Sequence, residues 1–249
     1  MIRSMAISID VEGDYWDESQ SEGITLGVPI LLDLLEGLDV KATFFWTASK
    51  ARSHEKILHQ TITAGHEIAC HGLFHENMAS LTPEEQDKVI YDAARILRSL
   101  AGRCVGFRAP RLSVNAELFE TLRRHDFLYD SSVPFWGVRR YKYGKQFDHP
   151  GLIELKCIPS YAFRLASRIG RNAVRRSCSS LEYAVLFVHP WEVIDASENV
   201  RRMPWRRKLN IINTLNTGDQ FLRALENELR AFRSTMEFVT CAQLAGVDS

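Results

Sequence analysis

Short strand-like segments alternate with helix-like segments along most of this chain, and that order restricts its possible folds more than any other feature. The strand-like segments are rich in β-branched and aromatic residues and lie at residues 6–10, 42–46, 67–70, 104–108, 127–129, 152–157, 184–189 and 237–240. A repeated strand–helix order predicts a parallel sheet. Because the strands are numerous, we expect a barrel, or a nearly closed form of one, in a single domain covering residues 1–249.

The helix-like segments carry start and stop signals. Residues 28–38 begin with a proline in the first turn, where its missing N–H is tolerated. Residues 82–85, Thr-Pro-Glu-Glu, have the form of a capping box and predict a helix that runs to about residue 100 and ends at a glycine. We expect two further helices, one over residues 113–125 with Ser113 as its cap and one near residues 218–233.

Polar side chains of the kinds that enzymes use follow five of the predicted strands. They are Asp10 and Glu12, His71 and His75, Arg108, Asp130, and His189. Because successive side chains alternate across a strand, Asp10 and Glu12 point to the same side. The carboxyl ends of the strands of a parallel barrel meet at one rim, where active sites form. We therefore expect these side chains to share one pocket.

The segment Gly65-His66-Glu67-Ile68-Ala69-Cys70-His71-Gly72-Leu73-Phe74-His75 places two imidazoles four residues apart, directly after a predicted strand. Two neutral imidazoles and a carboxylate oxygen suit Zn²⁺ or a similar divalent ion. The alternative is a histidine pair on a surface loop, beside acidic residues that are only solvated. His66 precedes the strand, and we expect it to be structural.

Composition is that of an ordinary globular protein, with 45% hydrophobic and 25% charged residues and a net charge of zero. Nothing in it suggests nucleic-acid binding, although residues 101–249 are basic, with 23 bases and 15 acids. Two basic stretches stand out, at residues 163–176 and 201–208, the second with Trp205. They are either solvated surface or a site for phosphate or anionic lipid headgroups, which would give peripheral contact with a membrane.

The five cysteines include no Cys-x-x-Cys pair, and we expect buried thiols in a reducing compartment. The first strand begins within a few residues of the amino end, and no apolar run approaches the roughly 20 residues of a membrane span. We therefore expect a cytoplasmic location.

Several motifs together resemble the polysaccharide deacetylase family, whose domain is also known from chitooligosaccharide deacetylases. The motifs occur in the family's order, from Ile7 to about Leu244. They are Gly65-His66-Glu67-Ile68 with His71-x-x-x-His75, then Phe107-Arg108-Ala109-Pro110, Tyr129-Asp130-Ser131-Ser132, and Phe187-Val188-His189-Pro190-Trp191. The resemblance implies a distorted (β/α)-barrel with about seven strands. It also implies a divalent metal, usually zinc, that serves to hydrolyse an N-acyl group from an amino sugar.

The resemblance also implies roles for particular residues. Asp10 corresponds to the catalytic base, Arg108 to the arginine that orients it, and His189 to the general acid. His71 and His75 correspond to metal ligands. The backbone N–H of Arg111 stands where the family has an oxyanion donor.

The first motif departs from the common family pattern. Many members have two adjacent aspartates, the second of which binds the metal, but here Val11 follows Asp10. The order Asp10-Val11-Glu12 resembles a subgroup in which the carboxylate two residues further on binds the metal. We therefore predict Glu12 as the third ligand. Relatives of this subgroup include enzymes of non-sugar amides and proteins without a functional metal.

Two questions about the pocket stay open at the level of sequence. Asp130 either orients His189 or caps a turn with the serines that follow it. Trp46, Trp136 and Trp191 either line a sugar-sized pocket or only pack. We include Asp130 and Trp191 with Arg111 among the predicted substrate or oxyanion residues.

The predicted reaction is hydrolysis of an N-acetyl or N-formyl group on an amino sugar. A cytoplasmic location favours a lipid-linked or nucleotide-linked sugar made inside the cell. The segment at residues 22–35 also resembles deformylases that act on lipid-linked 4-amino-4-deoxy-arabinose. The alternatives are an amidase of a non-sugar amide, with or without a metal, and a non-catalytic carbohydrate-binding relative. The oligomeric state stays open.

Overall fold

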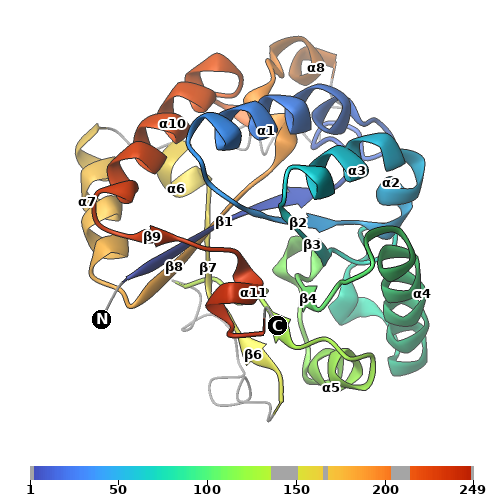
Figure 1. The fold of residues 1–249 in the computed structure, drawn as a ribbon. Coiled ribbons are helices and arrows are strands. Elements are labelled where there is room, and N and C mark those ends of the chain that lie inside the picture. Colours follow the sequence, from blue (N-terminus) through green and yellow to red (C-terminus); the bar gives the residue numbers. More distant parts are fainter. Residues whose placement is uncertain (1–2, 136–150, 165–167, 203–213, 248–249) are drawn as a thin grey trace.

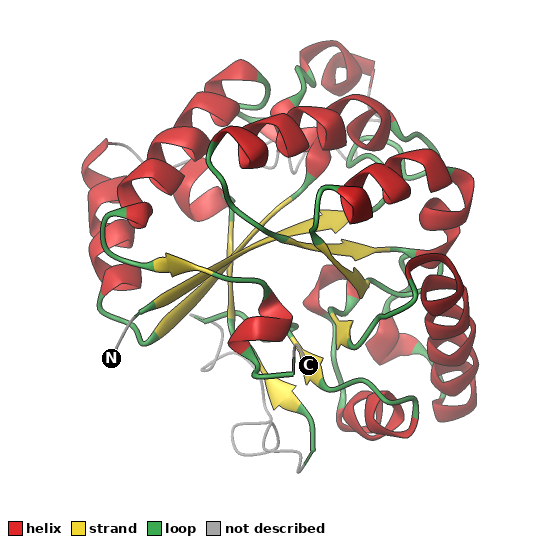
Figure 2. Ribbon diagram, in the orientation of Figure 1, coloured by secondary structure: helices red, strands yellow, loops and turns green. Residues whose placement is uncertain are grey.

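The computed structural model describes residues 3–135, 151–164, 168–202 and 214–247. Its strands form one curled, parallel sheet at the centre of the molecule, with helices packed around it (Figures 1 and 2). The strands are β1 (Ser4–Val11), β2 (Thr43–Trp46), β3 (Glu67–Cys70), β4 (Gly106–Phe107), β5 (Tyr129–Asp130), β6 (Ile153–Glu154), β7 (Cys157–Pro159), β8 (Tyr183–Val188) and β9 (Glu237–Phe238). Their order is β6-β5-β4-β3-β2-β1-β8-β7, and β9 pairs with the first residues of β1.

The described helices connect successive strands. The longer ones are α1 (Val28–Gly37), α2 (Ala48–Ser53), α3 (Glu55–Thr63), α4 (Pro83–Ala101), α5 (Ala116–Arg124), α7 (Arg168–Ser179), α8 (Ser197–Arg202) and α10 (Asp219–Arg233). The short turns are the π-helix η1 (Gly23–Gly27), the 3₁₀ turns η2 (Met78–Ser80), η3 (Pro110–Leu112) and η4 (Pro190–Val193), and the helices α6 (Tyr161–Arg164) and α11 (Cys241–Leu244).

The distorted parallel barrel is confirmed, but one predicted strand is wrong. Residues 152–157 do not form one strand. They contain β6, which pairs with β5, and only the first residue of β7, which pairs with β8 at the other end of the strand order. The backbone between them keeps contact with the chain after β5, because Leu155 donates to the carbonyl of Asp130 and Pro134 forms a parallel bridge with Cys157. This bent segment closes the barrel.

The barrel interior is a compact cluster of its own. It contains Ala6, Phe45, Ala69, Tyr129, Leu155, Cys157, Val185, Phe187, Cys241 and Ala242. The last two residues belong to α11, whose backbone N–H groups donate to Thr43 and Glu67 at the start of β2 and β3. Helix α11 therefore covers the amino-terminal end of the barrel, and the opposite end stays open for a site.

The helix signals are largely confirmed. Thr82 and Glu85 form the predicted capping box at the start of α4, and the helix ends at Gly102, whose φ of 74° is the left-handed conformation that glycine favours. The prediction of Ser113 as a cap is wrong. Helix α5 begins at Ala116, and the side chain of Asn115 accepts from the backbone N–H of Leu118. Asparagine caps a helix as well as serine does. Asn115 is the cap because it directly precedes the first residue of α5.

All five cysteines are buried free thiols, as predicted for small apolar residues.

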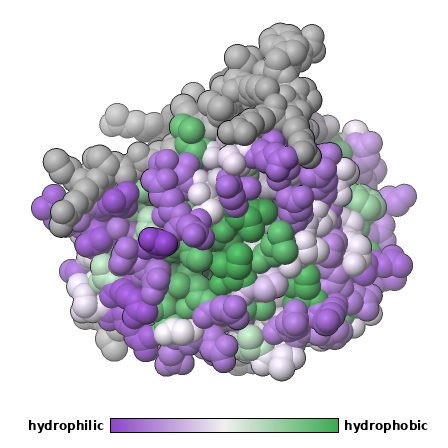
Figure 3. Space-filling model, turned by 90° about the horizontal axis from the view of Figure 1, so that it is seen from above, coloured by the Kyte–Doolittle hydropathy of each residue, from purple (hydrophilic) through white to green (hydrophobic). Residues whose placement is uncertain are grey.

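Figure 3 views the molecule from above and shows hydrophobic side chains gathered in one patch with polar side chains around it. Among the described helices, none is both long enough and apolar enough to cross a bilayer.

Candidate active site

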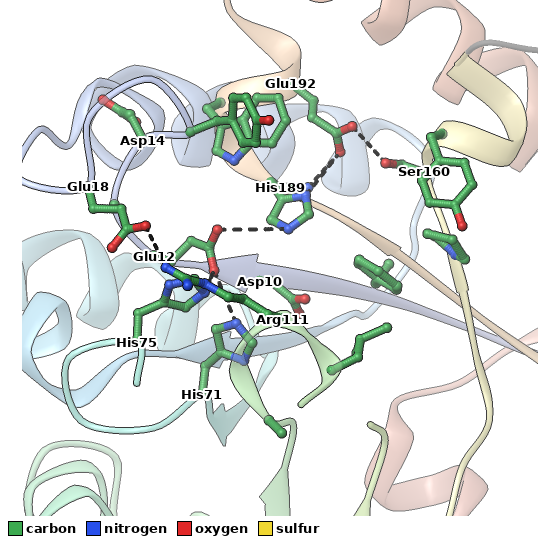
Figure 4. Close-up of a pocket in the computed structure, with 18 of the residues that line it drawn as sticks. Asp10, Glu12, Asp14, Glu18, His71, His75, Arg111, Ser160, His189 and Glu192 are labelled. Carbon is green, nitrogen blue, oxygen red and sulfur yellow. Dashed lines mark hydrogen bonds and ion pairs between the residues drawn. The ribbon is translucent and has the colours of Figure 1, made fainter. Parts of the chain in front are cut away.

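The carboxyl ends of the strands surround a cavity of about 630 Å³. Most of the predicted site residues line it (Figure 4), and they come from strands far apart in the sequence: Asp10, Glu12, His71, His75, Arg111, His189 and Trp191. The cavity thus brings together side chains from β1, from the loops after β3 and β4, and from the end of β8. The prediction that these strand ends share one pocket is confirmed for Asp10, Glu12, His71, His75 and His189, whereas Arg108 and Asp130 do not line the cavity.

Glu12, His71 and His75 form a compact triad that could hold a metal ion. One oxygen of Glu12 lies 3.1 Å from Nε2 of His71 and 2.6 Å from Nε2 of His75. Zn²⁺ binds imidazole nitrogen and carboxylate oxygen at about 2.0–2.2 Å. Two nitrogens and one oxygen that converge on one point, in the open mouth of a cavity, therefore suit a divalent ion with a coordination position left for water.

Contacts with the backbone orient the metal-binding atoms of the triad. Nδ1 of His71 lies 2.8 Å from the carbonyl oxygen of Arg108, which fixes the proton on Nδ1 and directs Nε2 toward Glu12. His75 has a φ of 74°, a conformation that a non-glycine residue adopts only under constraint. Burial raises the pKa of Glu12, but hydrogen bonds from both histidines outweigh it and hold this pKa well below its usual value. Glu12 is therefore a carboxylate.

Asp10 is held by a fully buried arginine inside the barrel. Nη1 of Arg108 lies 2.6 Å from Oδ1 of Asp10, and both side chains are almost completely buried. The guanidinium stacks 4.2 Å from the ring centre of Phe45 and donates to the oxygens of Ser8 and Ser131. The guanidinium thus fixes the position of the Asp10 carboxylate, as a general base requires.

His189 is oriented by a residue that the sequence analysis missed. Its Nδ1 lies 3.5 Å from Oε2 of Glu192, and its Nε2 lies 3.9 Å from Glu12. Glu192 is buried and also accepts from Ser160 at 2.6 Å and pairs with Arg164 at 2.9 Å. Burial lowers the pKa of His189, but the carboxylates of Glu192 and Glu12 raise it to about 9. The spacing His-x-x-Glu across a short turn was the sequence signal that could have identified Glu192 as the partner of His189.

We expect Glu192→Gln to lower the kcat of the reaction by about ten- to a hundredfold with little change in KM, because His189 loses the carboxylate that orients and charges it. In metal-free protein, the pKa of His189 measured by NMR falls below that of the wild type. Glu226→Gln, which changes an exposed glutamate on α10, is the matched control. A wild-type kcat in Glu192→Gln would remove Glu192 from the site.

Arg111 and Trp191 both line the cavity, as predicted. The Trp191 ring stacks on His189 at 5.1 Å between ring centres and meets Tyr15 at 5.3 Å, so it forms one wall. Arg111 lies in the turn η3 after β4 and has a φ of 58°. Trp46 packs in the buried core outside the barrel, so it does not line the pocket.

The assignment of Asp130 to substrate or oxyanion binding is wrong, and its role as a turn cap is confirmed. Asp130 is fully buried, accepts from the hydroxyl and backbone N–H of Ser132, and is not among the lining residues of the cavity. Ser132 in turn accepts from the backbone N–H of Ala109, next to Arg108. Asp130 therefore supports the loop that carries the arginine. Burial raises the pKa of Asp130 and that of its neighbour Glu154.

The raised pKa of Glu154 predicts a pH dependence of stability. A carboxyl group whose pKa is higher in the folded than in the unfolded chain stabilises the fold below its unfolded pKa, and this contribution is lost as pH rises toward the folded pKa. Glu154→Gln is always neutral and keeps the acceptor for Val133. We expect the difference in the midpoint of thermal unfolding, Glu154→Gln minus wild type, to increase from pH 5 to pH 8. A constant difference across this range would contradict the shift.

Other predicted features fall outside the site. His66 is structural, as expected, because its Nδ1 accepts from the backbone N–H of Ala42, and burial lowers its pKa to about 4. In the first basic stretch, Arg164 pairs with Glu192, and Arg171 and Arg175 pair with Glu228 of α10. The second basic stretch from residue 203 onward, with Trp205, and also Trp136, lie outside the described residues.

Known sequences similar to this chain are polysaccharide deacetylases. The family model for polysaccharide deacetylases matches residues 16–129. A peptidoglycan deacetylase from Helicobacter pylori is 26% identical over 143 residues, which are 52% of this chain and 49% of that protein. The chain thus spans about half the length of this curated relative. This similarity, which for the family model covers slightly less than half of the chain, is to the family that the motifs predicted.

Solved structures share the fold. Puue allantoinase has a TM-score of 0.70 at 15% identity, over 98% of this chain and 89% of that one. A family 4 carbohydrate esterase from Streptomyces lividans, solved in complex with acetate, has a TM-score of 0.58 at 16% identity, over 93% of this chain and 88% of that one. At these identities the similarity concerns the architecture, which agrees with the distorted barrel predicted from the sequence.

Proposed function

We propose that this protein is a metal-dependent hydrolase that removes an N-acyl group, acetyl or formyl, from an amino sugar. The observation that carries the proposal is the buried Asp10–Arg108 pair beside the triad of Glu12, His71 and His75 in one cavity. Similarity of residues 16–129 to the polysaccharide deacetylase family supports it. The donor set supports zinc as the ion, because nitrogen and carboxylate ligands with an open position are typical of catalytic zinc.

Each side chain around the cavity has a role in this reaction. A divalent ion bound by the triad would polarise the acyl oxygen and lower the pKa of its water to about 7. Asp10 accepts the proton of the attacking water, and Arg108 orients Asp10. The backbone N–H of Arg111 stabilises the oxyanion. His189, as an imidazolium, donates a proton to the leaving nitrogen, which is otherwise a poor leaving group.

The substrate is proposed as a carbohydrate or a carbohydrate-linked small molecule. A lipid-linked or nucleotide-linked amino sugar, a cytoplasmic location and contact with a membrane stay predictions. The internal ion pairs of Arg171 and Arg175 reduce the charge that the first basic stretch offers to a headgroup.

The direct test is a turnover assay with N-acetylated and N-formylated amino sugars and with a cyclic non-sugar amide, each with and without a chelator. We expect release of acetate or formate from the sugars, loss of turnover on chelation, and recovery with Zn²⁺. Turnover of the cyclic amide alone would replace the amino-sugar proposal with the amidase alternative. Turnover that resists chelation would contradict the metal, and no turnover of any compound would favour a non-catalytic carbohydrate-binding protein.

A further inference from the structure

One ion pair at the mouth of the cavity differs from all the other charged contacts around it. Nη2 of Arg111 lies 2.9 Å from Oε1 of Glu18, and the two side chains are 55% and 46% exposed. The acidic residues deeper in the cavity have hydrogen-bond or ion-pair partners, most of which are themselves largely buried. Asp10 binds Arg108, Glu12 lies between the histidines, Asp14 accepts from the backbone N–H groups of Glu22 and Gly23, and Glu192 binds Arg164.

The backbone fixes where the Arg111 side chain begins. The loop after β4 is tied down by the bond from Ala109 to Ser132, and Arg111 itself takes a left-handed conformation that costs a side-chain-bearing residue free energy. Such conformations persist where the surroundings require them, and they occur often at binding sites. In Figure 4 the Arg111 side chain lies across the mouth beside His75 and Glu12.

The loop that carries Glu18 is held just as firmly. Gly13 touches the carbonyl of Glu18 so closely that a Cβ at Gly13 would lie 2.0 Å from that oxygen. Nζ of Lys50 donates to the backbone oxygens of Ser19 and Gln20 and to the hydroxyl of Ser21. Glu18 therefore presents its carboxylate to Arg111 from a rigid support, in a position that a carboxylate or phosphate of a ligand could take instead.

We propose that Arg111 is a specificity-determining residue that binds an anionic group, a carboxylate or a phosphate, on the substrate close to the acylated nitrogen. Glu18 keeps the guanidinium across the mouth until the substrate arrives. An exposed ion pair contributes little stability, so it exchanges easily. A guanidinium has five N–H donors in a planar fork that fits a carboxylate or a phosphate through two hydrogen bonds, and the contact with Glu18 is made by one nitrogen. This inference rests on the proposed hydrolysis of an N-acyl amino sugar.

The test compares three N-acetylated amino sugars of similar size: a neutral one, one with a carboxylate and one with a phosphate. Binding is measured by calorimetry, and turnover by acetate release. We expect wild-type protein to bind one or both anionic sugars about ten- to a hundredfold more tightly than the neutral one. The carboxylate and phosphate arms tell which anion is preferred. In Arg111→Gln this ratio of affinities falls toward one, and in Arg111→Lys part of it remains. In Glu18→Gln affinity for the anionic sugar rises severalfold, because the internal competitor is gone.

Arg124→Gln is the matched control. Arg124, on α5, pairs with Asp87, on α4, at 2.9 Å, and the two side chains are 59% and 45% exposed, similar to Arg111 and Glu18. It keeps the wild-type ratio. An equal affinity of wild type for neutral and anionic sugars, or an unchanged ratio in Arg111→Gln, would overturn the proposal even if all three sugars are hydrolysed. Preferential binding of the anionic sugars without any acetate release would keep the role of Arg111 and reject the hydrolase.

Discussion

Asp10→Asn lowers kcat by about 10²–10⁴-fold, the range expected when a general base is lost. The amide keeps an oxygen that accepts from Arg108, but it no longer takes a proton from water. Because the site of Asp10 is buried and built around a guanidinium, no neighbouring group can replace the lost carboxylate at the same point. The measurement is steady-state turnover of an N-acetylated amino sugar, with circular dichroism to verify the fold.

Ser8→Ala is the control for Asp10→Asn. Ser8 also accepts from Nη1 of Arg108, at 2.8 Å, but it has no role in proton transfer. We expect Ser8→Ala to retain most of the turnover. If Asp10→Asn kept a kcat close to that of the wild type, Asp10 would not be the base, and the role of the buried arginine would need another explanation.

His75→Ala lowers turnover by about a thousandfold, since a metal that polarises the acyl oxygen and activates water contributes several kcal/mol to transition-state stabilisation. His75 supplies one of two imidazoles to the triad, and its Nε2 lies 2.6 Å from Glu12. Its loss leaves two ligands, too few for a catalytic zinc site. The assay is turnover before and after dialysis against a chelator and then with added Zn²⁺. Wild type recovers, and His75→Ala does not.

His59→Ala provides the matched control for His75→Ala, because His59 lies exposed on α3 and does not line the cavity. Its chelation and recovery should follow those of the wild type. Recovery of His75→Ala to wild-type turnover would mean that the ion, if it binds, is not held by this histidine.

The sequence predicted the strand ends better than it predicted the closure of the barrel. Period-2 alternation put Asp10 and Glu12 on one side of a strand, and β3 ends at Cys70 just before the first histidine, as expected. The split between β6 and β7 was not predictable, because both strands are short and only two residues separate them. Their separation depends on pairing with β5 and β8, which lie more than 20 residues away in the sequence.

The same limit applies to the side chains of the site. The motif around Arg108 indicated an orienting arginine. Its burial over Phe45 inside the barrel depends on contacts between residues far apart in the sequence and was not predictable from the motif. The sequence analysis considered only Asp130 as a partner of His189 and missed Glu192. In the structure Asp130 accepts from Ser132 in a turn, whereas Glu192 lies in the same loop as His189, three residues further on.

Titration of metal-free protein with Zn²⁺ by calorimetry tests the central claim most directly. We expect one ion per chain in the wild type, and weak or no binding at this stoichiometry in the double variant Glu12→Gln/His75→Ala. The histidine at position 59 serves again as the control, since His59→Ala should bind one ion. Equal binding by the wild type and the double variant, or no binding by either, would contradict an ion held by Glu12, His71 and His75.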